Sequence, residues 1–98
     1  MFYTTRHWVA KPGHEDALAA GLRQLVAMGL PLAAAAYVGR DVARPGHFVT
    51  FGVWADQATS DAFGAHPETN RVAAEAIAPH LDPDAGVPSA HVHMEPLA

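Results

Sequence analysis

The first part of the chain predicts a strand followed by a helix. Residues 2–10 combine aromatic, β-branched and Thr side chains, a composition typical of a β-strand, and Lys11-Pro12-Gly13 ends it. Acidic residues then suit the first turn of a helix that ends near Gly29, with Pro31 beyond it. The apolar residues of this helix recur at steps of four, three and three, which predicts one buried face. They are Leu18, Leu22, Leu25 and Met28.

Two further strands follow, with a hairpin loop between them. Residues 33–39 are rich in Ala, which favours helix, but Tyr37-Val38 and the short distance to the next turn predict a strand. Asp, Pro and Gly in residues 40–46 indicate the loop. Residues 47–55 form the clearest strand, and because both of its faces are apolar we predict that it is central and covered on both sides. Val49, Phe51 and Val53 share one face, and Phe48, Thr50 and Trp54 share the other.

The remaining residues predict a second helix in two pieces and a last strand. Asp56 can cap a helix from Gln57 to about Ala65. His66-Pro67 interrupts that helix, and the proline suits the first turn of a new one. Residues 82–88 indicate a loop, and residues 90–95 alternate apolar and polar side chains as a strand does.

The predicted order of elements is therefore β-α-β-β-α-β, with the second helix divided. This order is the ferredoxin-like arrangement, an α+β fold in which one antiparallel sheet carries helices on one face, and residues 1–98 make a single domain. Such a sheet leaves its other face open. Since residues 47–55 are apolar on both sides, we predict that a second copy of the chain covers the open face in a homodimer.

Composition narrows the possible functions. Charged residues make up 16% of the chain, against about 25% in an ordinary soluble domain, which also suggests surface hidden in an oligomer. The net charge of −4 with six Lys and Arg excludes a basic face for nucleic acid, and the lack of Cys excludes a disulfide framework, a Cys-bound zinc and a thiol nucleophile. The longest apolar run, residues 30–38, is too short to span a membrane and the N-terminus lacks a signal-peptide core, so we predict a cytoplasmic location.

Short segments on either side of the predicted strands resemble a known family. Val9-Ala10-Lys11-Pro12-Gly13-His14-Glu15-Asp16-Ala17 resembles the "V-x-K-P-G-x-E-x-A" start of domains like the antibiotic biosynthesis monooxygenases. Phe51-Gly52-Val53-Trp54-Ala55-Asp56, followed by Ala62-Phe63 and a His before a proline, resembles their third strand and second helix. The resemblance covers essentially the whole chain. It implies a dimeric α+β barrel, in which two sheets face each other and each subunit has a ligand cleft between helices and sheet.

The resemblance implies several activities, and this chain departs from two of their patterns. Some members of the family oxidise aromatic polyketides with molecular oxygen and no cofactor, some cleave haem, and others handle quinols. The cofactor-free oxygenases have an Asn four residues before the strand Trp, where this chain has Thr50 before Trp54. The haem-cleaving members have an Asn in the first strand, where this chain has Arg6. Haem cleavage also needs an axial His, and His66 lies near that region.

Candidate site residues follow from the predicted strands together with this resemblance. Trp54 and Trp8 would line the cleft, because aromatic faces suit a planar ligand; the alternative is that they only seal the core. Arg6 shares a strand face with Trp8 and would anchor a carboxylate or phenolate; the alternative is a salt bridge. His66 is the candidate base, or else an exposed helix cap. The remaining predicted substrate contacts are Thr50, Tyr37 and Phe63.

Three further histidines allow a metal site as a weaker alternative. His91 and His93 alternate on the last predicted strand, which would neighbour the first strand and His7. Three imidazoles can hold zinc, copper or iron. Two His on a solvated strand are commoner than a metal site, so we predict no metal ligands.

The leading prediction is a cofactor-independent monooxygenase acting on an aromatic, polyketide-like or quinol substrate in the helix–sheet cleft. In the mechanism that the family implies, Arg6 would stabilise the substrate anion and His66 would take the proton. No bound cofactor is predicted. The alternatives are a haem-binding or haem-degrading relative and a protein without enzymatic activity that binds a small apolar ligand or assists a pathway. The chain lacks G-x-S-x-G, G-x-x-x-x-G-K and G-x-G-x-x-G motifs, which would indicate acyl transfer, phosphate or dinucleotide chemistry.

Overall fold

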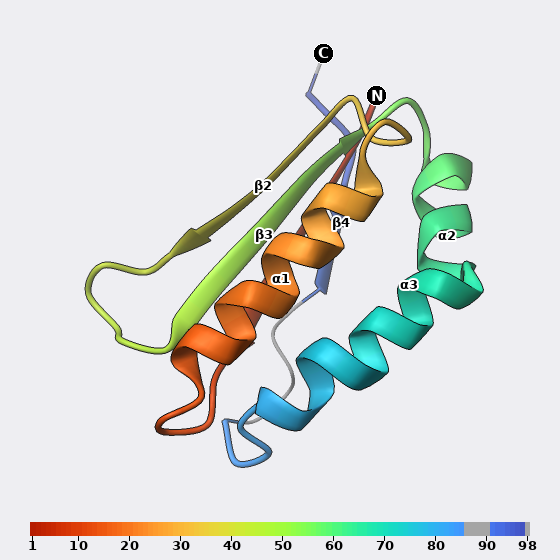
Figure 1. The fold of residues 1–98 in the computed structure, drawn as a ribbon. Helices are drawn as coiled ribbons and strands as arrows, with labels where there is room; N and C mark the ends of the chain where they lie inside the picture. The colour runs from red at the N-terminus through yellow and green to blue at the C-terminus, as the bar shows by residue number, and fades with distance from the viewer. Residues whose placement is uncertain (86–90, 98) are drawn as a thin grey trace.

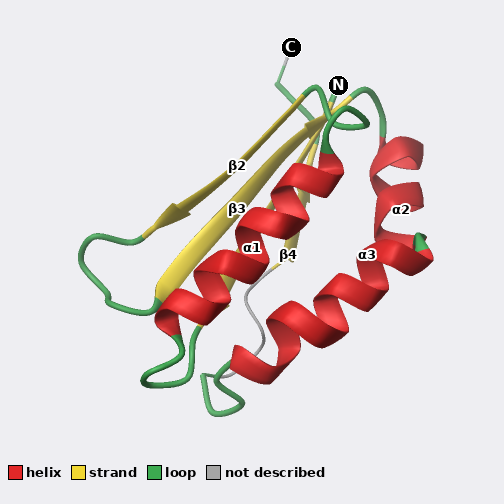
Figure 2. Cartoon of the chain, viewed as in Figure 1, coloured by secondary structure: helices red, strands yellow, loops and turns green. Residues whose placement is uncertain are grey.

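Four antiparallel strands form one sheet, and all the helical segments lie on one face of it (Figures 1 and 2). The structure, a computed structural model, describes residues 1–85 and 91–97. In chain order the elements are β1 (Phe2–Val9), α1 (Glu15–Gly29), β2 (Ala35–Arg40), β3 (His47–Trp54), α2 (Gln57–Ala65), α3 (Pro67–Val72), the π-helical turn η1 (Ala73–Ile77), the 3₁₀ turn η2 (Ala78–His80) and β4 (His91–Met94).

The sheet order β2-β3-β1-β4 is that of the ferredoxin-like fold, so the predicted α+β class is confirmed. β1 and β3 are the central pair, in a register that sets Arg6 opposite Thr50 and Trp8 opposite Phe48. The predicted last strand began at Ala90, which lies outside the described residues, as do residues 86–88 of the predicted loop. Among the described residues, no helix has the length and apolar character that a membrane crossing requires.

Local sequence signals explain why the second helix is divided. Asp56 caps α2 by accepting a hydrogen bond from the backbone N–H of Thr59 at 2.8 Å. At His66 the backbone is extended, which ends α2, and Pro67 then occupies the first turn of α3. The Nδ1 of His66 accepts from the Glu68 N–H at 3.1 Å, so this imidazole caps α3.

The core lies between the sheet and the helices in two clusters of buried apolar residues. The larger one joins Leu18 and Leu22 of α1 to Trp8 and Phe48 of the central strands and to Ile77 of η1. The predicted apolar face of α1 therefore points into the core. The smaller cluster lies near the other end of the sheet and contains Phe2, Ala33 and Trp54, with Phe63 packed against it.

The opposite face of the sheet carries no element of this chain among the described residues (Figure 1). The register places the odd-numbered residues of β1, β2 and β3 and the even-numbered residues of β4 on it. We call this surface the open face. Its apolar members include Tyr3, Tyr37, Val49, Phe51, Val53, Val92 and Met94.

Candidate functional site

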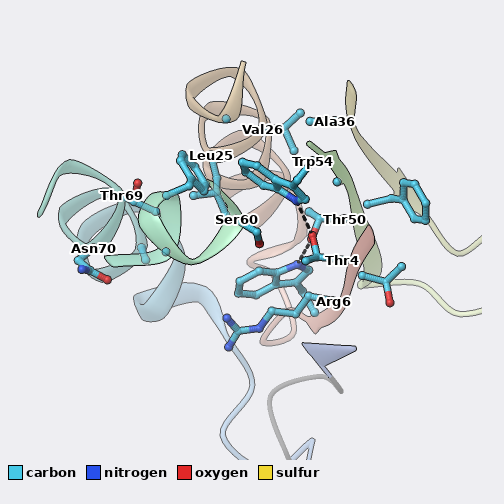
Figure 3. A pocket seen from close by; sticks show the side chains of 18 residues that line it. Thr4, Arg6, Leu25, Val26, Ala36, Thr50, Trp54, Ser60, Thr69 and Asn70 are labelled. Atoms are coloured by element: carbon cyan, nitrogen blue, oxygen red, sulfur yellow. Dashed lines mark hydrogen bonds between the residues drawn. The ribbon is translucent and has the colours of Figure 1, made fainter. Parts of the chain in front are cut away.

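A cavity of about 210 Å³ lies between the central strands and the helices (Figure 3). Its sheet wall comes from β1 and β3 with Ala36 of β2, and α1 supplies Leu25, Val26 and Gly29. The remaining wall comes from α2, α3 and the first residue of η1. Most of this lining is apolar, which is the usual character of a small-molecule site.

Two tryptophans in the sheet wall are held by reciprocal hydrogen bonds between β1 and β3. The indole N–H of Trp8 donates to the Thr50 hydroxyl at 3.0 Å, and that of Trp54 donates to the Thr4 hydroxyl at 3.0 Å (Figure 3). Both indoles are about 95% buried. Because each ring has a fixed partner on the neighbouring strand, both side chains hold defined orientations at the cavity without any ligand.

Gly52 is required where Trp54 folds back over the sheet. A Cβ at this position would lie 2.6 Å from the Trp54 Nε1 and 2.9 Å from the Thr4 Oγ1. Any larger residue would therefore push apart the indole and the hydroxyl that accepts its hydrogen bond. Packing in the cavity wall thus explains why a glycine lies between Phe51 and Trp54 on this strand.

Arg6 brings a positive charge to the cavity lining. Its guanidinium carbon lies 4.2 Å from the centre of the Trp8 ring, a cation–π contact. In the described part of the chain no carboxylate forms an ion pair with Arg6, and its Nε is buried without a hydrogen-bond partner. Burial lowers the pKa of Arg6, which still leaves the group charged at neutral pH. The Arg6 guanidinium therefore has no counter-ion in the described chain, and an anion bound in the cavity would supply one.

The structure brings together five of the seven side chains that the sequence singled out. Arg6, Trp8, Thr50, Trp54 and Phe63 all line the cavity. Phe63 reaches it from α2 and packs on Trp54 with ring centres 5.4 Å apart. These residues come from three separate elements, so only the fold makes them neighbours.

Tyr37 and His66 lie elsewhere. Tyr37 pairs with Phe51 on β3 and belongs to the open face, where 62% of it is exposed. A strand side chain on that face points away from the cavity. His66 is exposed and caps α3, which agrees with the alternative prediction of an exposed helix cap. Neither residue is among those that line the cavity.

The arrangement of the strands also separates the histidines considered for a metal. β4 does neighbour β1, but His7 lies on the open face and pairs there with His47, Nε2 to Nδ1 at 2.8 Å. His93 contacts the ring of Phe2 on the opposite face. Over residues 1–85 and 91–97, no three His or acidic side chains gather as metal ligands would.

Sequence reasoning missed the polar residues that the helices contribute to the cavity, Ser60, Thr69 and Asn70. Ser60 and Thr69 are both more than 90% buried. The available signal was a polar residue on the side of each short helix that faces the sheet. The sequence did not show which side of α2 or α3 faces the sheet, because the apolar faces of these helices are weak.

Comparison with solved structures finds antibiotic biosynthesis monooxygenases that share the fold of this chain. A crystal structure of one such protein is 27% identical, with a TM-score of 0.84 over 100% of both chains. A candidate antibiotic biosynthesis monooxygenase from Chloroflexus aurantiacus is 24% identical, with a TM-score of 0.72 over 99% of this chain and 93% of its own. One from Nitrosomonas europaea is 14% identical, with a TM-score of 0.83 over 100% of both.

The structural neighbours across the full length are therefore antibiotic biosynthesis monooxygenase proteins, and the resemblance found in the motifs is confirmed. No family model and no curated protein sequence matches the chain. The more distant neighbours, below a quarter identical, bear on the fold alone.

Proposed function

We propose that the protein is a monooxygenase without a bound cofactor, acting on a phenol or enol of one or two rings in the helix–sheet cavity. The observation that carries this proposal is an apolar cavity walled by two fixed indoles and an arginine that lacks an ion-pair partner in the described chain. The fold shared with antibiotic biosynthesis monooxygenases supports it.

The size of the cavity sets the size of the substrate. A cavity of about 150 Å³ is enough to hold benzene. At about 210 Å³, the cavity suits one ring or two fused rings better than a tricyclic polyketide. The cavity is also small for a haem macrocycle, and His66 lies outside it, so we do not propose haem binding.

The charges of the lining suit a substrate that is already acidic. Arg6 is the one ionisable side chain in the lining, and no His, Asp or Glu joins it among the described residues. A positive charge favours the anion of a bound phenol or enol and lowers the substrate's pKa. The proton then leaves to solvent through the mouth of the cavity.

The substrate anion would next give one electron to dioxygen, the required co-reactant. Recombination of the two radicals forms a carbon–oxygen bond at a ring carbon that carries a hydrogen, and a proton taken up from solvent completes the hydroperoxide. Loss of water from this hydroperoxide gives a quinone or ketone. One oxygen atom stays in the product and the other leaves as water, so no external reductant is consumed. The indoles and Phe63 would keep bulk water from the ring during these steps.

The test is product formation with and without oxygen. We expect naphthols and hydroquinones incubated with the protein in air to give quinone products faster than without protein, and to give none under nitrogen. Arg6→Gln should lower the rate at least tenfold, while Arg40→Gln, a charge removed from the exposed β2, should not change it.

A result in which the compounds bind but never react would replace this proposal with its alternative. The lack of a base in the described lining favours that alternative, a protein that binds a small aromatic anion without transforming it. The Arg6→Gln variant would then weaken binding alone. Equal product with and without oxygen would overturn the oxygenase proposal.

We also propose that a second copy of the chain covers the open face. The central strand β3 places Val49, Phe51 and Val53 there, and Tyr3 packs on Phe51 with ring centres 5.8 Å apart. Apolar side chains over much of one sheet face are typical of an interface. An identical copy would bury the same residues on both sides, which a two-fold dimer requires.

A further inference from the structure

Ser60 stands out among the hydroxyl groups around the cavity. It lies on α2, 9% of it is exposed, and in the described chain its hydroxyl makes no hydrogen bond. Ser60 lines the cavity together with both tryptophans, and Figure 3 shows its side chain on the helix wall. Arg6 stacks on the ring of Trp8 in the sheet wall.

The other hydroxyls of the lining are differently placed. Those of Thr4 and Thr50 each accept a hydrogen bond from an indole N–H. The Oγ1 of Thr69 also lacks a partner, but it is buried away from solvent, so a ligand in the cavity does not reach it. Ser60 is therefore the hydroxyl that a bound molecule can meet.

Ser60 lines the cavity, so a molecule in the cavity can supply the hydrogen-bond partner that the described chain does not. A Ser on a helix commonly bonds the carbonyl four residues earlier, yet the Asp56 carbonyl bonds only the backbone N–H of Ser60, at 3.4 Å. The hydroxyl therefore has no hydrogen bond within its own helix and is available to a molecule in the cavity. A ligand oxygen would satisfy it.

We infer that Ser60 is a positioning residue, which hydrogen-bonds an oxygen on the edge of the aromatic ligand that faces α2. The inference rests on the proposed function, since it concerns the same cavity. It gives the cavity two recognition points: Arg6 on the sheet wall for a negative charge and Ser60 on the helix wall for an oxygen. A site with such a hydroxyl discriminates against ring analogues that lack the oxygen.

The test compares 2,6-dihydroxynaphthalene with 2-naphthol, which lacks the second oxygen, under nitrogen and with ¹⁵N-labelled protein. The chain has two tryptophans and both line the cavity, so their two indole N–H signals report occupancy directly. We expect Ser60→Ala to weaken 2,6-dihydroxynaphthalene binding about three- to tenfold, the usual range for one hydrogen bond, and to leave 2-naphthol binding within about twofold. Ala suits a helix, so the variant should fold.

The matched control is Thr69→Val, which removes the hydroxyl of a second lining residue, one that is buried beyond reach of a ligand. It should leave the ratio of the two affinities unchanged. The inference falls if Ser60→Ala changes both affinities equally or neither of them, or if Thr69→Val causes the same selective loss. If the unaltered protein binds neither compound, the proposed function falls with it, which is a distinct result.

Discussion

The two faces of the sheet differ in what they require of the chain. On the face under the helices, three large side chains of the cavity wall are each fixed by a specific partner: Trp8 by Thr50, Trp54 by Thr4, and Arg6 by stacking on Trp8. The open face is apolar, and its exposed members Tyr37, Val49 and Val92 are held by no such contacts in the described chain. The face under the helices holds individual side chains in fixed positions, whereas the open face offers apolar surface that a partner can bury.

The two faces therefore differ in which substitutions they tolerate. Precise placement depends on single atoms, such as the hydroxyl of Thr4 or the missing side chain of Gly52. Burial of area depends on apolar character, so many substitutions are tolerated provided that no charge is introduced. A charge should therefore do most harm on the open face, and a single added methyl group should do most harm at the cavity wall.

The largest effect should come from a charge on the open face. Val49 lies on the central strand β3 and is 42% exposed in the single chain. In a dimer, Val49→Asp would bury two carboxylates with no partner, and each buried ion costs several kcal/mol. We expect the dissociation constant of the dimer to rise at least a hundredfold, measured by light scattering over a range of concentrations.

Val42→Asp is the matched control, because Val42 is 98% exposed in the loop between β2 and β3. It adds the same charge away from the sheet and should leave the mass of the particle unchanged. A protein that is monomeric before any substitution would contradict the dimer and would leave the open face without its proposed partner.

A smaller but more local effect is expected on the cavity face. Gly52→Ala places a methyl group against the Trp54 Nε1 and the Thr4 Oγ1, so the indole must move. Overpacking of this kind costs about 1–3 kcal/mol of unfolding free energy. We also expect affinity for a bound naphthol to fall about tenfold or more, because the displaced ring is part of the cavity wall. Chemical denaturation and ligand titration measure the two quantities.

Gly39→Ala is the control for this substitution. Gly39 lies in the neighbouring strand β2, and a Cβ there meets nothing within 4 Å. The same change should leave stability within about 0.5 kcal/mol and leave binding unaltered. Equal losses in the two variants would mean that strand glycines matter here for the backbone and not for the position of Trp54.

The elements of the fold could be predicted from the sequence because each carries a local signal. Asp56 and Pro67 mark helix starts, and the stripe that includes Leu18 and Leu22 marks the buried face of α1. The Ala-rich β2 was the ambiguous segment, and its strand state follows from pairing with β3. Propensity alone favoured the helix there, and tertiary hydrogen bonding decided the outcome.

The site was less accessible to sequence reasoning because it depends on which face each side chain occupies. Arg6 and Trp8 were predicted to share a face, since alternation along one strand is enough to show it. Tyr37 needed the register of β2 against β3, which no local pattern gives. Ser60 needed the orientation of a short helix whose apolar face is weak in the sequence.

The smallest effect should be a pH dependence on the open face, where the histidine pair lies. His7 and His47 are joined at 2.8 Å, and two imidazolium ions cannot share one hydrogen bond. Burial, followed by the positive charges of His47 and Arg44, lowers the pKa of His7, although Asp41 acts in the opposite direction. The unfolded chain therefore takes up this proton first, at its ordinary pKa of about 6.5.

Stability linked to this group is consequently complete above about pH 6.5 and is lost as the pH falls toward the lowered pKa of His7. His47→Gln removes one positive charge while keeping a side chain that can accept a hydrogen bond. We expect the melting temperature of the variant to fall less than that of the unaltered protein between pH 7 and pH 5. Because the other histidines are the same in both proteins, the difference between the two curves isolates the pair. Parallel curves would show that the open face does not sense pH through His7 and His47.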